Sequence, residues 1–310
     1  MLNNNSFKAI LATILALIAF AANSVLARLA LEVPDIDPGS FTTIRLISGA
    51  VMLFILVLIL RPKQPLNTQI KYPIKTLYQK AMLFELEARG SWTSAFMLFL
   101  YASCFSFAYV VLDTATGALI LFGAVQITMI IMSLFNGKKL HASEWAGLIL
   151  AFLGFVYLIY PNLGSPTLYG FVLMAIAGIG WGVYSVRGRD SLNPLLDTTF
   201  NFIRAVPFAG FFSILNLSNL SLGSDGIYYA IISGALTSGI GYAIWYVALK
   251  NLQLTTAAVV QLSVPIIAAI GGVMFVNESL TLRLVISTII ILGGILLVIF
   301  GRASFKIKAK

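Results

Sequence analysis

The sequence is poor in the residues that build water-facing surfaces and metal sites. Only 10% of its 310 residues are charged, whereas 59% are hydrophobic. A soluble domain of this length would carry about 25% charged residues. A single cysteine and a single histidine, Cys104 and His141, exclude an intrachain disulfide and a Cys/His metal cluster. We therefore expect an integral membrane protein with no metal or other cofactor.

Enzyme signatures are also missing from the chain. There is no zinc or serine hydrolase motif, and no predicted span has an Asp or Glu at its middle. Gly178, Gly180 and Gly182 lie in an apolar run without a following Lys-Ser/Thr, which indicates helix packing rather than a phosphate loop. We therefore predict that the protein is not an enzyme. The net charge of +9 predicts basic cytoplasmic loops rather than nucleic-acid binding.

Long apolar runs dominate what remains. A transmembrane helix needs about 20 largely apolar residues. The first such run is long enough to span and is followed by many more, so we interpret it as an uncleaved helix. Ten segments meet the length and composition: 7–29, 41–60, 92–111, 114–135, 143–160, 167–187, 198–217, 226–249, 254–275 and 282–301. The polar stretch 61–91 holds three prolines and is predicted to be a cytoplasmic loop. The fold class expected is all-α.

The basic residues orient these spans. With the N-terminus inside, sixteen of the twenty Lys and Arg residues fall in cytoplasmic segments, and only Arg28 and Arg283 fall in outer ones. This bias follows the positive-inside rule. It predicts a bacterial inner membrane protein with both termini in the cytoplasm.

The two halves of the chain resemble each other. Phe41-x-x-Ile-Arg45 opens one apolar run, and Phe200-x-x-Ile-Arg204 opens another at the corresponding place. Each half holds five predicted spans, so the second must enter the membrane from the opposite side. Inverted repeats are typical of secondary transporters, in which the substrate sits between the halves near the membrane midplane.

These features resemble the drug/metabolite transporter superfamily, of the EamA type, with repeats at 7–160 and 167–301. The matching motifs are the arginine early in the second helix of each repeat, the fourth-helix starts "TGALI" and "TTAAV", Pro265, and "VNESLTLRLVISTIIILGGILLVIFG". The first repeat departs from the pattern, with lysine where the second has Glu278. The resemblance implies export or exchange of small organic metabolites, such as amino acids or drugs, by alternating access.

The resemblance also implies that the first, third and fourth helices of each repeat line the cavity. Aromatic and neutral polar side chains on them are the binding candidates, although Trp and Tyr also mark membrane interfaces and small polar residues also join helices. The candidates are Asn23, Tyr101, Tyr109, Gln126, Trp181, Tyr184, Tyr242, Trp245 and Gln261.

The two repeated arginines allow three interpretations. Each lies near a helix end, so Arg45 and Arg204 could reach the headgroups and serve a structural role. They could instead form gates, with Arg45 meeting Asp113 or Glu278 on the outside. They could also bind an anionic substrate directly.

The expected partners are therefore a small-molecule substrate and the bilayer, not nucleic acid. No mid-span carboxylate suggests a proton relay. A non-transporting membrane scaffold or a lipid translocator is the alternative function.

Overall fold

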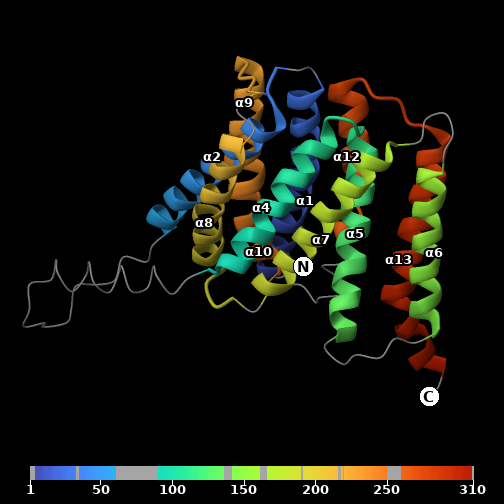
Figure 1. Cartoon of the computed structure of the whole chain (residues 1–310). Coiled ribbons are helices and arrows are strands. Elements are labelled where there is room, and N and C mark those ends of the chain that lie inside the picture. The colour runs from blue at the N-terminus through green and yellow to red at the C-terminus, as the bar shows by residue number, and fades with distance from the viewer. Residues whose placement is uncertain are drawn as a thin grey trace, which may run out of the picture.

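The computed structural model describes residues 4–32, 35–60, 90–135, 142–160, 166–189, 191–215, 218, 220–249 and 260–308. Most of the predicted loop 61–91, the start of the predicted ninth span, and His141 lie outside these ranges. Within them the chain is almost entirely helical and contains no strand (Figure 1). An isolated β-bridge joins Ile36 and Leu222.

Helices occupy each of the ten segments predicted to span. The first seven are α1 (Asn4–Leu31), α2 (Pro38–Leu60), α4 (Trp92–Tyr109), α5 (Thr114–Phe135), α6 (Ala142–Ile159), α7 (Leu168–Gly188) and α8 (Pro194–Leu215). A continuous stretch follows, made of α9 (Ser224–Ile232), the π-helix η2 (Ser233–Ile240) and α10 (Gly241–Leu249). The last elements are α12 (Val264–Gly271), the π-helical η3 (Gly272–Val276) and α13 (Leu282–Lys308).

Length and composition fit a membrane. Seven helical stretches in the described part of the chain are apolar and long enough to cross a bilayer: α1, α2, α4, α5, α6, α7 and the continuous α9–η2–α10. The outward faces are apolar, with Phe152 64% exposed on α6 and Phe211 65% exposed on α8. Polar groups lie inside instead, including Asn23 and Arg45. A chain that exposes phenylalanine and buries arginine is arranged for lipid, so this is an all-α membrane protein.

Helix α6 pairs with α13 at one edge of the bundle (Figure 1). Glycines permit the close approach, because a Cβ on Gly147 would lie 2.5 Å from the carbonyl oxygen of Gly294. The pair joins the remainder mainly through α5. These two helices are the fifth and tenth predicted spans, and neither was among the helices expected to line the cavity.

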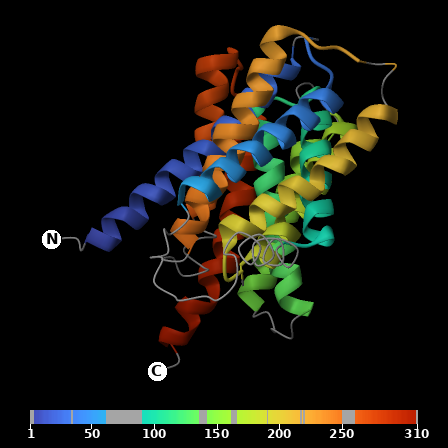
Figure 2. The same cartoon turned by 90° about the vertical axis from the view of Figure 1, so that its left-hand side faces the viewer.

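The other helices surround a shared core. Helix α4 packs against α7 and α8, α5 against α7 and α12, and α2 against α8 and η2. Helix α1 contacts α9, η2 and α10 on one side and α12 on another. Figure 2 shows the blue α1 and α2 running beside the orange α9–η2–α10 stretch. The predicted binding helices therefore meet at the centre of the bundle.

Candidate functional site

A small internal cavity lies where these central helices meet. Its lining residues are Phe20 and Asn23 from α1, Tyr101 and Phe105 from α4, Leu121 and Phe122 from α5, Trp181 from α7 and Tyr242 from α10. The volume is about 10 Å³, at the lower limit for one water molecule. The cavity is therefore closed around its own side chains, and any organic solute requires it to expand.

Aromatic rings make up most of the cavity wall. Phe20 is the hub, with ring centroids 5.9 Å from Trp181, 5.9 Å from Tyr242 and 5.6 Å from Trp245. Trp181 in turn lies 4.7 Å from Tyr242. Edge-to-face aromatic pairs of this kind are worth about 0.5–1.5 kcal/mol each beyond their burial. We call Phe20, Tyr101, Phe122, Trp181, Tyr242 and Trp245 the aromatic cluster.

Six of the nine predicted binding candidates meet here. Four of them, Asn23, Tyr101, Trp181 and Tyr242, line the cavity directly. Trp245 reaches it through Phe20, and Tyr184 stacks on Trp181 at 5.6 Å. The phenylalanines of the lining, Phe20, Phe105 and Phe122, were not predicted, and neither was Leu121. An apolar side chain in an apolar helix carries no signal that separates cavity from lipid.

Arg45 lies inside the bundle rather than at the headgroups. Its side chain is 1% exposed. Nη2 donates to the Tyr101 hydroxyl at 2.9 Å and Nε donates to Ser238 Oγ at 3.2 Å. Cζ lies 4.7 Å from the Phe105 ring centroid and 5.2 Å from that of Tyr101. Nη1 has no hydrogen-bond partner among the described residues. The interpretation that this arginine reaches the membrane surface is therefore wrong.

A polar network connects the cavity to the π-helix. Asn23 Oδ1 accepts from Ser233 Oγ at 2.5 Å and from Thr237 Oγ1 at 3.1 Å. Asn23 Nδ2 donates to the Tyr101 hydroxyl at 3.4 Å. The same hydroxyl accepts the hydrogen bond from Arg45 Nη2. Single π-turns within α-helices occur often at functional sites. Here η2 presents Ser233 and Thr237 to Asn23 and Ser238 to Arg45.

A second polar cluster lies where α1 ends and α5 begins, at the top of Figure 1. Arg28 Nε lies 3.3 Å from Glu278 Oε1, and Arg28 Nη2 lies 3.3 Å from Glu32 and 3.9 Å from Asp113. The Glu278 carboxylate accepts from the Thr114 backbone N–H at 2.9 and 3.0 Å and from its hydroxyl at 3.0 Å. We call Arg28, Asp113, Thr114 and Glu278 the latch. The predicted pairing of Asp113 or Glu278 with Arg45 is wrong, because Arg28 holds both.

Local backbone geometry positions the Glu278 carboxylate. Asn277 has a left-handed conformation, with φ 60°, which reverses the chain at the end of η3. A Cβ on Gly272 would lie 2.5 Å from Glu278 Oε2, so only glycine leaves room for the carboxylate. Burial raises the pKa of Glu278 above its ordinary value, while the hydrogen bonds from Thr114 and the charge of Arg28 act to lower that pKa.

Tyr109 links the latch to the aromatic cluster. Its backbone oxygen accepts from Arg28 Nη1 at 3.1 Å, and its hydroxyl donates to the Thr114 carbonyl at 3.3 Å. Its ring lies 4.7 Å from that of Phe105, which lines the cavity. This predicted cavity residue therefore lies between the latch and the cavity.

Arg204 occupies a different environment from its repeat partner. It is half-buried, with Cζ 5.9 Å from the Trp92 ring and 5.8 Å from the Phe200 ring. Gly90, with φ +69°, passes so close that a Cβ would lie 2.7 Å from Arg204 Nη1. Asp197 accepts from the Gly90 N–H at 3.0 Å. The repeated arginines therefore have unlike surroundings.

The two predicted glutamines are buried but are not among the cavity-lining residues. Gln126 on α5 is 2% exposed, and Gln261, just before α12, is 6% exposed. Arg28 was not predicted as a site residue. Its signal was present in the sequence, since it is one of two basic residues in the predicted outer segments and lies four positions before Glu32.

Comparison with known proteins gives several relatives. An uncharacterized protein of Pseudomonas aeruginosa is 42% identical over 301 residues, covering 96% of this chain and 97% of the relative. The probable amino-acid metabolite efflux pump of Escherichia coli is 22% identical and is matched over 79% of its length, against 78% of this chain. An uncharacterized transporter of Bacillus subtilis is 20% identical, with 88% of this chain and 91% of that protein covered.

A solved crystal structure shares the fold. Its TM-score is 0.61 at 16% identity, and the match covers 94% of this chain and 96% of the other. The model of the EamA-like transporter family matches the chain twice, at residues 7–160 and 168–300. These matches point to a transporter rather than an enzyme. The chain belongs to the EamA-like transporter family.

Proposed function

We propose that this protein is a secondary transporter that moves small organic metabolites through the central cavity by alternating access. The observation that carries the proposal is the closed cavity itself. Helices α1, α4 and α5 from the first half and α7 and α10 from the second all contribute to its wall. Polar groups inside a membrane protein are costly and mark pathways for solutes. Two relatives are named as probable amino-acid metabolite efflux pumps, which supports amino acid metabolites as the substrates and export as the direction of transport.

Helix packing supports ten spans in two inverted repeats. Exchange of the halves would pair α1 with α7, α2 with α8, α4 with α9–η2–α10, α5 with α12 and α6 with α13. The contact of α1 with α10 then corresponds to that of α7 with α4, and the contact of α2 with η2 to that of α8 with α4. The contact of α1 with α12 corresponds to that of α7 with α5. The contacts α2–α8, α5–α12 and α6–α13 each join a helix to its own equivalent in the other half, so exchange of the halves leaves them unchanged.

The proposed topology gives the latch a role. Ten spans place both termini on the same side of the membrane, and the excess of Lys and Arg in the segments on that side assigns it to the cytoplasm. The bacterial relatives suit the inner membrane. The latch then faces outward and ties α1, α5 and the turn after η3 together above the cavity. We assign it as the outer gate, with Arg28, Asp113 and Glu278 as gating residues. Alternating access requires this gate to open when the inner end closes.

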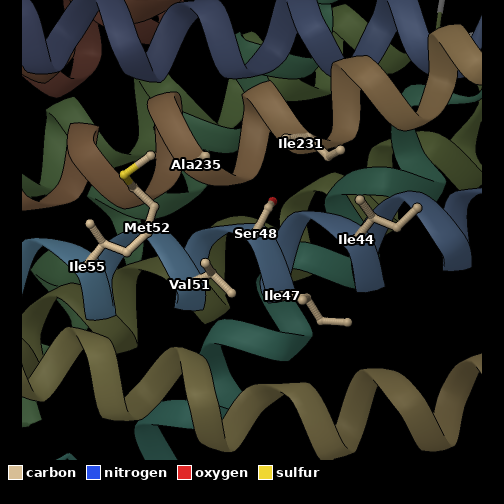
Figure 3. Close-up of a pocket in the computed structure, with 8 residues that line it drawn as sticks. All are labelled: Ile44, Ile47, Ser48, Val51, Met52, Ile55, Ile231 and Ala235. Carbon is tan, nitrogen blue, oxygen red and sulfur yellow. The ribbon is translucent and has the colours of Figure 1, made fainter.

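A lipid translocator fits less well. A groove of about 380 Å³ runs between α2 and α9–η2 on the outside of the bundle (Figure 3). Its lining is Ile44, Ile47, Ser48, Val51, Met52, Ile55, Ile231 and Ala235. The one hydroxyl, Ser48 Oγ, already donates to the Arg45 carbonyl oxygen at 3.2 Å. Such a groove suits an acyl chain but offers a polar headgroup no path across the membrane.

A transport assay tests the proposal. Purified protein in liposomes is expected to exchange amino acid metabolites, detected by mass spectrometry of the internal and external pools. Trp181→Ala removes the ring that contacts three others of the aromatic cluster and should lower the flux about tenfold or more. Phe152→Ala is the matched control, because this ring is 64% exposed on α6 and away from the cavity. Equal flux in the two variants, or no protein-dependent flux, would refute the proposal.

A further inference from the structure

We propose that Arg45 is the anion-binding group of the transport site and that the solute is a small carboxylate with an aromatic or bulky apolar body. This inference rests on the proposed function and specifies the substrate class. Arg45 is fully buried beside the cavity, and its guanidinium lies against Phe105 and Tyr101, which both line it. Burying a charge costs free energy, so a charge placed this deep must have a functional or structural role that offsets the cost.

The guanidinium is incompletely satisfied. Nε and Nη2 use Ser238 and the Tyr101 hydroxyl, both neutral acceptors. Nη1 has no acceptor among the described residues. A buried donor without an acceptor costs about 1–3 kcal/mol, and more when it is charged. A carboxylate entering the cavity would supply acceptors for Nη1 and, in exchange for the Tyr101 hydroxyl, for Nη2. Arginine binds planar carboxylates in this two-pronged way.

The cavity composition selects the sign of the charge. Aromatic walls alone would suit a cation, which they attract through their π-faces. No carboxylate lines this cavity in the described part of the chain, and the charged group next to it is the positive Arg45. A cationic solute would be repelled by that charge without a compensating acid. An anion or a zwitterion is attracted instead.

The same walls select the body of the solute. Around the cavity, Phe20, Trp181 and Tyr242 present rings whose faces and edges pack within 6 Å of one another. When the cavity expands, these rings separate and lose contacts that only an apolar or aromatic group can replace. A carboxylate with an aromatic side chain satisfies Arg45 and the rings together.

The repeat provides the matched control. Arg204 occupies the corresponding position in the second half, but it is half-buried and lies against Trp92 and Phe200. Neither of those rings is among the cavity-lining residues. Arg204→Gln therefore removes the same charge from the same sequence context without altering the proposed anion site.

The experiment measures binding of radiolabelled L-phenylalanine to the purified full-length protein, with phenylpyruvate and L-phenylalaninamide as competitors. Phenylpyruvate keeps the carboxylate, and the amide lacks it. We expect phenylpyruvate to compete at least tenfold more strongly than the amide. Arg45→Gln should abolish this difference, Arg45→Lys should keep part of it, and Arg204→Gln should leave it unchanged.

Competition by phenylpyruvate and L-phenylalaninamide on the wild-type protein tests the proposal even if Arg45→Gln does not give a monodisperse protein. Equal or stronger competition by the amide, or no binding of either carboxylate, overturns it. An unchanged preference in a folded Arg45→Gln variant also overturns it. These results leave the proposed function standing whenever liposomes still show protein-dependent flux of another solute. Absence of flux for every metabolite overturns the proposed function itself.

Discussion

Replacement of Arg28 by alanine is expected to open the outer gate and expose the passage toward the cavity. Arg28 and Glu278 are nearly buried, with side chains 13% and 10% exposed. Loss of a charge-assisted contact to a buried group costs on the order of 1.5–3 kcal/mol. Because a tenfold change in an equilibrium corresponds to about 1.4 kcal/mol, the open state should gain tenfold or more in population.

A thiol placed below the latch reports this opening. Ser24 is fully buried on α1, one turn before Arg28 and next to Asn23. In a Cys104→Ser background, which removes the single native thiol, Ser24→Cys should react slowly with a membrane-impermeant thiol reagent added outside. Addition of Arg28→Ala should accelerate that reaction about tenfold. Arg283→Ala is the control, since Arg283 donates to the Tyr160 carbonyl at the same end but contacts no latch residue in the described chain.

Exchange of the two latch charges should not restore closure. The double variant Arg28→Glu/Glu278→Arg retains one acidic and one basic side chain but places the basic one at the N-terminus of α5. That terminus presents the Thr114 N–H and the positive end of the helix dipole, both of which favour a carboxylate. The double variant should therefore label as fast as Arg28→Ala. Slow labelling of Arg28→Ala would show that the latch does not hold the gate, whereas slow labelling of the double variant would show that the ion pair closes the gate in either orientation.

Much of the architecture could be read from composition and periodicity. Each predicted span contains a helix in the structure, because runs of about 20 apolar residues permit little else in a membrane. Six of nine predicted cavity residues meet at the centre, since Trp, Tyr and Asn inside a span need polar or aromatic neighbours. Trp181 and Tyr184, at helical spacing on one face, are the clearest case.

The polar contacts could not be predicted in the same way. Arg45 was placed by its distance from a helix end, whereas the bundle encloses that end and supplies Tyr101 and Ser238 from helices distant in sequence. Ser233 and Thr237 are four residues apart and share a helix face, but spacing within one helix cannot show that this face meets Asn23 on α1. The left-handed conformation of Asn277 could not be predicted either, because it depends on the path that the following residues take.

Gly234→Ala is expected to be strongly destabilising, because its added methyl group meets the nearest backbone atom that any glycine faces in the described part of the chain. Gly234 lies in η2 where it crosses α2. An added Cβ would lie 2.0 Å from Ser48 Oγ and 2.2 Å from the backbone oxygen of Arg45. The serine hydroxyl can rotate away, but a backbone oxygen can move only with its helix. Overpacking of this kind costs about 1–3 kcal/mol and occasionally more, and we expect the upper end here.

Thermal unfolding of the detergent-purified protein measures this cost. For a chain of 310 residues, 3 kcal/mol corresponds to a fall in Tm of about 5 °C. Gly210→Ala is the control, because a Cβ at that position on α8 meets nothing within 4 Å. The control should be neutral or slightly stabilising, as alanine is the better helix former. A Tm for Gly234→Ala within the error of the control would mean that α2 and η2 are less closely packed than described.

A double variant separates the two clashes. Ser48→Ala removes the hydroxyl and leaves the Arg45 carbonyl oxygen in place. Ser48→Ala/Gly234→Ala should therefore recover only part of the lost Tm. Because the oxygen that must move belongs to Arg45, the remaining displacement carries the guanidinium with it. We expect the double variant to bind carboxylates more weakly than Ser48→Ala alone, since the position of α2 sets both the packing of η2 and the place of the charge beside the cavity.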